Sequence, residues 1–341
     1  MRIYPLVGIA FCLTSLLALT GCQALSHRAP RHITREGPPL RGVNLGNALE
    51  APKEGQWGVV LEESYFEEIA RVGFENVRIP IRWSAHAAES PPYTIDPTFF
   101  QRVDWAVEQS LSRGLVTIIN IHHYQALMQD PVGQKERFLA LWRQIATHYQ
   151  DADEHLYFEV LNEPSGNLNV LWNEYLQEAI AVIRESNPTR RIIVGPARWN
   201  NLRELDYLQL PEGDPNLIVT FHYYEPFAFT HQGAEWVTGA DKWLGTKWLG
   251  SPVEVTSIRL DMDYAANWAK EHRVPLYLGE FGAYSKADMA SRVRWTSTVA
   301  REAEARGISW AYWEFCAGFG VYDRERRAWR QELLHALIPE K

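Results

Sequence analysis

Cysteine is scarce in this 341-residue sequence, whose three cysteines are Cys12, Cys22 and Cys316. The first two lie within or directly after an apolar N-terminal stretch, so a domain that begins downstream has one thiol and no internal disulfide. A structural zinc site of the cysteine type needs several thiolates and is therefore excluded. We expect a fold that depends on neither disulfides nor a bound metal.

Excess positive charge is also absent, since the net charge is −8 and the pI is about 5.8. Nucleic-acid-binding domains carry a basic surface, so nucleic acid is excluded as a partner. A glycine-rich turn of the form GxGxxG, typical of an open dinucleotide-binding sheet, is missing as well. Aromatic residues, in contrast, are plentiful, with 14 Trp and 15 Tyr. Composition alone leaves open whether they fill the core or stack on sugar rings.

One long, mostly apolar run covers residues 4–19 and follows Arg2. This pattern is typical of a secretory signal peptide, which we place at residues 1–21. Residues 19–22, with the sequence LTGC, resemble a bacterial lipobox, which predicts cleavage before Cys22 and acylation of its thiol. The alternative is an ordinary cleavage site followed by an incidental cysteine.

Acylation of Cys22 would make the protein exported and lipid-anchored to a membrane. Gln23 follows the cysteine, which by resemblance to Gram-negative lipoproteins favours the outer membrane if the host is Gram-negative. Residues 22–39 are polar, contain prolines and show no periodicity, so we interpret them as a tether.

Short apolar segments alternate with longer amphipathic ones in the rest of the chain. The expected strands are 42–46, 76–80, 116–123, 157–163, 191–196, 217–224, 276–282 and 308–315. The expected helices are 61–72, 99–112, 134–149, 171–185, 262–271, 287–305 and 331–337. Eight strands in alternation with helices predict an α/β fold, a single (β/α)8 TIM barrel that covers residues 40–341.

Polar and aromatic side chains follow nearly every expected strand, at the end where TIM barrels carry their active sites. In chain order these residues are Asn44, Asn47, Glu50, Arg78, His122, His123, Asn162, Glu163, Trp199, His222, Tyr224, Glu280 and Trp313. Each one alone is weak, because a buried His or Arg is usually structural and Glu163 could cap a helix. So many buried polar groups would destabilise a core without a function for them, so we interpret their convergence as a catalytic site.

Two carboxylates with Arg, His, Tyr and Trp, and no metal cluster, indicate hydrolysis of a sugar acetal. That reaction needs a proton donor for the leaving oxygen and a negative group at the anomeric carbon. Glu163 and Glu280 can divide these roles if their surroundings separate their pKa values. The residues alone leave open which glutamate is the acid, and a separation of about 5–5.5 Å would indicate retention of configuration.

Six motifs resemble glycoside hydrolase family 5, of the retaining clan whose acid and nucleophile lie on barrel strands four and seven. They are VRIPIRW (77–83), INIHHY (119–124), FEVLNEP (158–164), TFHYY (220–224), LGEFG (278–282) and AYWEF (311–315). INIHHY, FTHQGAEW (229–236) and WAYWEFCAGFGVYD (310–323) look like the bacterial subfamily that contains thermophile endoglucanases. Some of those enzymes accept both β-1,4-glucan and β-1,4-mannan. The resemblance covers residues 40–341.

The resemblance implies a retaining endo-β-1,4-glucanase that works through a covalent glycosyl-enzyme, with Glu163 as acid/base and Glu280 as nucleophile. It implies six supporting residues, namely Arg78 and Tyr224 beside Glu280, His222 beside Glu163, Asn162 at the sugar 2-hydroxyl, His122 in the −1 subsite and Trp313 as a stacking platform. It implies outer substrate contacts at Asn47, Glu50, His123, Trp199, His231, Trp236 and Glu314. It implies no cofactor and no metal, and we expect a monomer.

Three alternatives stay open at this point. The chain could be a β-mannanase or xyloglucanase of the same family, since glucose and mannose differ at one hydroxyl that no motif reveals. It could be a surface lipoprotein that binds glycan without hydrolysing it, although such a binder would have little use for both glutamates. An aldolase would need a lysine at a strand end for Schiff-base chemistry, and none of the eight expected ends carries one.

Overall fold

The structure is a computed structural model that describes Met1 and residues 41–339. Apart from Met1, the predicted signal peptide, the anchor at Cys22 and the tether lie outside the described residues. Eight parallel strands close into a barrel in chain order, with β1 paired to both β2 and β8. The strands are β1 Arg41–Asn44, β2 Asn76–Ile79, β3 Val116–Asn120, β4 Leu156–Glu159, β5 Ile192–Val194, β6 Leu217–Tyr223, β7 Leu276–Phe281 and β8 Ser309–Tyr312. The predicted single TIM barrel is confirmed.

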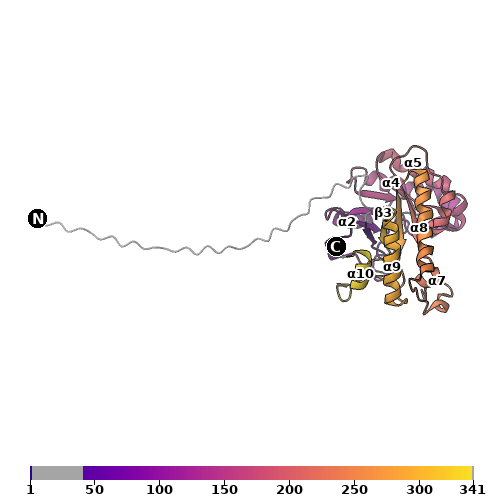
Figure 1. The fold of residues 1–341 in the computed structure, drawn as a ribbon. Helices are drawn as coiled ribbons and strands as arrows, with labels where there is room; N and C mark the ends of the chain where they lie inside the picture. Colours follow the sequence, from indigo (N-terminus) through magenta and orange to yellow (C-terminus); the bar gives the residue numbers. More distant parts are fainter. Residues whose placement is uncertain (2–40, 340–341) are drawn as a thin grey trace. The chain divides into compact units, whose positions relative to one another are not determined.

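Helices surround the barrel, and α8 and α9 run side by side on its outer surface (Figure 1). The helices are α1 Glu63–Val72, α2 Pro97–Leu111, α3 Gln125–Gln129, α4 Pro131–His148, α5 Trp172–Ser186, α6 Ala197–Asn200, α7 Phe227–Thr230, α8 Pro252–His272, α9 Met289–Glu304 and α10 Gln331–Leu337. Four short 3-10 helices are η1 Trp83–Ala85, η2 Gly166–Val170, η3 Leu202–Tyr207 and η4 Ala240–Trp243. A two-stranded hairpin of β9 Tyr322–Asp323 and β10 Ala328–Trp329 follows β8.

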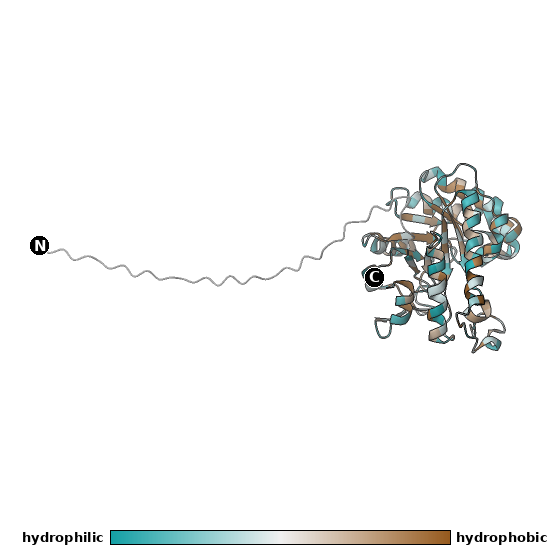
Figure 2. Cartoon of the chain, viewed as in Figure 1, coloured by the Kyte–Doolittle hydropathy of each residue, from teal (hydrophilic) through white to brown (hydrophobic). Residues whose placement is uncertain are grey.

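The barrel strands are buried on both faces, which explains why their sequences are apolar without alternation. Figure 2 shows hydrophobic residues gathered on the strands and hydrophilic ones on the outer helix surfaces. Six buried residues from five strands form a small apolar cluster of their own, namely Val116, Ile118, Tyr157, Ile193, Tyr277 and Ala311. Side chains two positions apart on a strand share a face. Glu159 therefore lies on the same face as Tyr157, one layer closer to the C-terminal ends.

The predicted helices are all present, but α8 is much longer than expected. It begins at Pro252 instead of residue 262 because Ser251 caps it in a capping box with Glu254, and proline occupies the first turn. The side chains of Asp96 and Asp130 cap α2 and α4 by accepting from the backbone N–H groups of Thr98 and Gly133, each directly before a proline, so these helices also begin earlier than predicted.

The eight parallel strands all begin at one end of the barrel, its N-terminal end, and all finish at the other, its C-terminal end. The chain enters β1 at Arg41, whose guanidinium binds Glu304 of α9 through Nε at 2.7 Å and Nη2 at 3.1 Å. Within the described residues, no helix combines the length and apolar character needed to cross a membrane. The candidate site lies in the loops at the C-terminal end of the barrel, opposite Arg41.

Candidate active site

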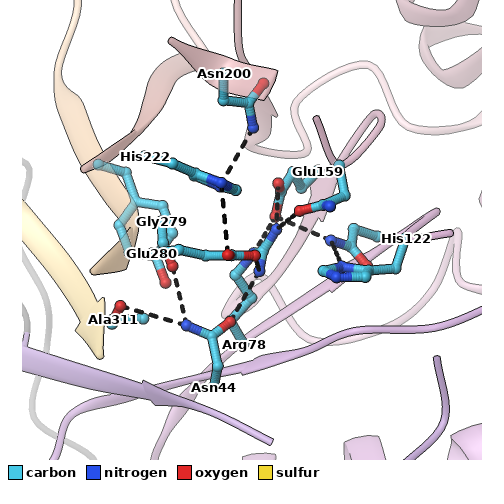
Figure 3. A network of polar contacts seen from close by, with 12 residues as sticks. Asn44, Arg78, His122, Glu159, Asn200, His222, Gly279, Glu280 and Ala311 are labelled. Atoms are coloured by element: carbon cyan, nitrogen blue, oxygen red, sulfur yellow. Dashed lines mark hydrogen bonds and ion pairs between the residues drawn. The ribbon is translucent and has the colours of Figure 1, made fainter. Parts of the chain in front are cut away.

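The guanidinium of Arg78, fully buried on β2, is the centre of a polar layer at the C-terminal end of the barrel (Figure 3). Its Nη1 donates to Asn44 and to Glu280, each at 2.8 Å. Its Nη2 donates to Asn162 at 2.7 Å and to Glu159 at 2.8 Å, and its Nε donates to the second oxygen of Glu159 at 2.5 Å. One cation therefore orients groups from β1, β4 and β7 at once.

Glu280 lies at the end of β7 and is 5% exposed. One of its oxygens accepts from Arg78, and the other accepts from the Tyr224 hydroxyl at 2.8 Å. Burial raises the pKa of Glu280, while the charge of Arg78 and the Tyr224 hydrogen bond oppose that rise. Because both oxygens are held by donors, the site favours an ionised, fixed carboxylate at this position.

Glu163 follows β4 and has a different environment. Its φ of 49° is in the left-handed region, a conformation that costs a non-glycine residue about 1 kcal/mol and recurs at functional sites. Its side chain is 29% exposed, and its Oε1 lies 2.8 Å from His222 Nδ1. Burial raises the pKa of Glu163 to about 7, with Arg78 opposing the rise and Glu159 adding to it. A glutamate with this pKa holds a proton that it can donate.

His222 connects the two glutamates. It lies in register with Glu280 directly after an irregularity in the β6–β7 pairing, where Gly279 of β7 has no partner in β6, and its Nδ1 is 3.6 Å from Glu280 Oε2. A Cβ at Gly279 would lie 2.6 Å from Thr220 Oγ1 and 3.2 Å from His222 Nε2, so only glycine fits there. Asn200 Nδ2 is 3.3 Å from Nε2, and burial lowers the pKa of His222 to about 4. The ring is therefore neutral, with its hydrogen on Nδ1 directed to Glu163.

The two carboxylates are close together. One oxygen of Glu163, one of Glu280 and a ring nitrogen of His222 all lie within 4.8 Å of one another. These three residues are the only group of potential metal ligands among residues 41–339 with that spacing. Their hydrogen bonds to one another and to Arg78 and Tyr224 already account for them, so we assign them to acid–base chemistry. The spacing matches a retaining glycosidase, since an inverting one leaves room for a water between its carboxylates.

A wall of rings lies beside the carboxylates. His122 is 3% exposed and stacks on Trp313, with centroids 5.6 Å apart and planes at 5°. Burial lowers the pKa of His122 well below its usual range and that of His123 to about 4, so both rings are neutral. Trp57, 39% exposed in the loop after β1, meets His123 edge to face at 5.4 Å. Sequence analysis missed Trp57, because nothing in its loop sequence distinguishes it from a surface tryptophan.

A second aromatic group lies in the loops after β6, β7 and β8. His231 is 7% exposed and stacks on Phe227 at 4.1 Å, and it meets Tyr224 edge to face at 4.8 Å. Trp236 is 60% exposed and packs against Tyr284 at 4.9 Å. The ring contact between His231 and Tyr224 places His231 beside the residue that donates to Glu280, and Trp236 lies further out.

Trp199 and Asn47 are the remaining predicted outer residues with accessible side chains. Trp199 is 59% exposed in the loop after β5, where a φ of 62° turns the chain sharply. Asn47 is partly buried after β1 with a φ of 63°. Both are therefore placed in loops at the C-terminal end of the barrel, as the sequence predicted.

Glu50 and Glu314 require a correction, because the structure does not present them to a ligand. Glu50 is 1% exposed and accepts from the backbone N–H groups of Asn47 and Ala48. Glu314 is fully buried and accepts from the backbone N–H groups of residues 316, 317 and 319. Both carboxylates hold loop backbone in place instead of lining a surface.

Glu159 is the main residue of the polar layer that sequence analysis missed. It is 1% exposed, and both of its oxygens are bound by Arg78. Asn120 also lies 3.4 Å from it and 3.2 Å from His122 Nδ1. The only signal in the sequence is an acid inside the apolar strand FEVL (158–161), which is costly to bury without a partner.

The comparisons with known proteins agree with this geometry. The family model described as Cellulase (glycosyl hydrolase family 5) matches residues 36–318, most of the chain. The chain belongs to glycosyl hydrolase family 5. This membership confirms the family that the sequence motifs resembled.

Individual relatives of this family 5 chain include Endoglucanase H of Acetivibrio thermocellus, which is 39% identical over 304 residues. That match covers 87% of the chain and 32% of the relative, so the chain spans about a third of that longer protein. Solved structures of Thermotoga maritima Cel5A are also similar. The complex with cellobiose is 55% identical and the complex with mannotriose 54%, both with a TM-score of 0.86 over 88% of this chain and 97% of Cel5A.

Proposed function

We propose that this family 5 chain hydrolyses internal β-1,4 bonds of glucans with retention of anomeric configuration. The observation that carries the proposal is the contrast between two adjacent carboxylates. Glu280 is held by a guanidinium and a hydroxyl, whereas the pKa of Glu163 is raised to about 7 and its one neutral partner is His222. This contrast assigns Glu280 as the nucleophile and Glu163 as the acid/base.

In the first step the Glu280 carboxylate forms a bond to the anomeric carbon while the glycosidic C–O bond breaks. Glu163 transfers its proton to the leaving oxygen at the same time. In the second step Glu163 takes a proton from water, whose oxygen bonds to the anomeric carbon and releases Glu280. Asn162, whose carbonyl oxygen is bound by Arg78, has its amide N–H groups available for the sugar 2-hydroxyl.

The stereochemical course tests this mechanism. Proton NMR of the first product formed from a β-glucan oligosaccharide should show the β-anomer, with the α-anomer appearing later by mutarotation. An initial α-anomer would mean single displacement and would overturn the role of Glu280 as nucleophile. No hydrolysis of any β-1,4-glycan would favour a surface protein that only binds glycan.

The preferred polymer is a glucan in this proposal, with mannan or glucomannan as an additional substrate. Endoglucanase H supports the first, and the mannotriose complex of Cel5A supports the second. A side-by-side assay on carboxymethyl-cellulose, β-glucan, xyloglucan and glucomannan, with product sizing, tests both. Endo action releases mixed oligosaccharides early, and rates highest on mannan or xyloglucan would make the chain a β-mannanase or xyloglucanase.

We further propose that the protein is exported, acts as a monomer and is anchored by a lipid on Cys22, in the outer membrane if the host is Gram-negative. The support is the lipobox-like sequence at residues 19–22 and the polar segment that follows it. Cys22→Ser should move activity from the membrane fraction to the soluble fraction. Unchanged fractionation would contradict the anchor, and a dimer-sized peak in light scattering would contradict the monomer.

A further inference from the structure

Glu159 has a position that simple packing does not explain. It is 1% exposed, which is rare for a carboxylate, and it accepts from the Nε–H and from one N–H of Nη2 of Arg78. Only Nη1 of the same guanidinium reaches Glu280. Arg78 therefore makes two hydrogen bonds to Glu159 and only one to Glu280, although Glu159 lies deeper in the barrel than Glu163 and Glu280.

Charge counting shows what this pairing does. With Glu163 protonated, the ions of the layer are Arg78, Glu159 and Glu280, so the net charge is −1. Loss of the Glu163 proton would bring it to −2 in a buried, poorly screened layer. Without Glu159 the same loss would take the layer only from 0 to −1, with Arg78 paired to Glu280 alone.

The other titratable groups around Glu163 do not replace this effect. Arg78 on β2, His222 and Tyr224 of the β6 segment and Glu280 on β7 interact with Glu163 itself, and His122 after β3 and Tyr277 on β7 lie beside Arg78. The two histidines are neutral, because burial lowers the pKa of His222 to about 4 and that of His122 well below its usual range. Both tyrosines keep their protons, because burial raises their pKa values.

We propose that Glu159 is a positioning residue that neutralises Arg78 and thereby keeps the proton on Glu163 until the leaving oxygen takes it. Glu159 acts through Arg78 and through the electrostatic field, and it contacts neither the substrate nor the reacting atoms. The proposal rests on the proposed function, because it needs Glu163 to be the acid.

The test is the pH profile of Glu159→Gln, which removes the charge and keeps the size and one acceptor oxygen. The basic limb of kcat/KM on a substrate with a poor leaving group should move to lower pH by about one to two units, as expected for a lost charge several ångströms away. Glu159→Asp retains the charge, so its basic limb should stay at the parent position even if its rate is lower. A limb that stays in place in Glu159→Gln while only the rate falls would overturn the proposal.

The matched control is Asp214→Asn. Asp214 also forms a bidentate pair with an arginine, Arg184, at 2.8 and 3.1 Å, but it precedes β6 and therefore lies at the other end of the barrel. Its removal should leave both limbs unchanged. A shift equal to that of Glu159→Gln would mean that any lost ion pair moves the profile, and would also overturn the proposal.

A second measurement decides the matter if Glu159→Gln does not fold. Carbon-13 NMR of glutamate carboxyl carbons in the parent chain should show that Glu163 carries its proton near pH 6. An ionised Glu163 at that pH would overturn the proposal. A parent chain that shows this proton on Glu163 but hydrolyses no glycan would overturn the proposed function alone.

Discussion

Two pairs of carboxylates occupy the C-terminal end of this barrel, and their partners differ in kind. Glu163 and Glu280 are bound by side chains, from His222, Arg78 and Tyr224. Glu50 and Glu314 are bound by backbone N–H groups of their own loops. Burial raises the pKa of every one of the four, to about 8 for Glu50 and to about 7 for both Glu163 and Glu314.

A raised pKa therefore does not distinguish a catalytic carboxylate from a structural one in this molecule. The distinction lies in the partners and, for Glu163, also in the exposed fraction, because its side chain retains 29% exposure while Glu50 and Glu314 have almost none. His222 binds one oxygen of Glu163, and Arg78 and Tyr224 bind Glu280, whereas backbone donors bind the oxygens of Glu50 and Glu314 inside turns. Each experiment below tests this difference between the two pairs.

The largest effect is expected for Glu280→Gln, which removes the nucleophile. Hydrolysis of carboxymethyl-cellulose should fall by about 10⁴-fold or more, because no covalent intermediate can form. Glu314→Gln is the comparison, and its loss in kcat should be less than about tenfold. Equal losses in these two variants would erase the proposed difference between the pairs, and circular dichroism shows whether each variant is folded.

Glu163→Ala should show a loss that depends on the leaving group. On a polymer, whose leaving oxygen needs a proton, the rate should fall by about 10²–10⁴-fold. On an aryl cellobioside with a dinitrophenyl leaving group the first step should be nearly unaffected, and added azide should restore turnover by attacking the glycosyl-enzyme. Equal losses on both substrates would remove the acid role of Glu163.

The direction in which the activity of the parent chain changes with pH follows from the protonation states of Glu163 and Glu280. Activity on polymer should fall as the pH rises through about 7, because Glu163 loses the proton it must donate. It should also fall on the acidic side, where Glu280 becomes protonated. Initial rates in buffers of constant ionic strength measure both limbs, and activity that is still rising well above pH 8 would contradict a protonated Glu163.

Tyr224→Phe removes one of the two donors that fix Glu280 and should lower kcat by about tenfold, as expected for one hydrogen bond to a charged group. The acidic limb should move to higher pH, because the ionised form of Glu280 loses a stabilising partner. Tyr284→Phe is the control, since its hydroxyl donates to Glu235 in a loop instead. An unmoved acidic limb in Tyr224→Phe would show that Arg78 alone sets the ionisation of Glu280.

The smallest effect concerns stability at Glu50. An unfolded glutamate loses its proton near pH 4.5, whereas folded Glu50 keeps its proton up to about pH 8. The folded state binds more protons in between, so the free energy of unfolding should decrease as the pH rises across this window. Guanidinium denaturation of Glu50→Gln at several pH values should show a weaker decrease than the parent. The surface variant Glu178→Gln should keep the parent slope, and a parent slope of the opposite sign would contradict this protonation state.

Much of the fold could be read from the sequence because strands buried on both faces leave unmistakable apolar segments. The strand ends then identified Glu163, Glu280, Arg78 and Tyr224, since parallel strands bring their carboxyl ends together whatever their distance along the chain. The true start of α8 was missed because the cap at Ser251 and Pro252 precedes a stretch with a weak apolar pattern. Caps are local signals, so closer attention to serine–proline pairs would have found it.

The roles of Glu159, Glu50 and Glu314 could not have been predicted from the residues. Glu159 depends on Arg78, whose guanidinium reaches it only after β2, β3 and β4 have paired. Glu50 and Glu314 depend on backbone N–H groups that converge in particular turns. The residue types in a loop do not show where its backbone N–H groups point. Partners that arise from tertiary structure or from turn geometry are therefore the part that needs coordinates.

The bidentate ion pair between Arg41 and Glu304 fixes the start of β1 to α9, at the end of the barrel opposite Glu163 and Glu280. A load applied at Arg41 is thus received by a bidentate ion pair and by β1, and not by the loops around Glu163. Immobilisation on a bead or an electrode through this end of the barrel should consequently leave the C-terminal end, with its carboxylates, unobstructed and undisturbed. Attachment through a residue at the C-terminal end of the barrel, such as Trp199, would place the support where the polymer has to bind.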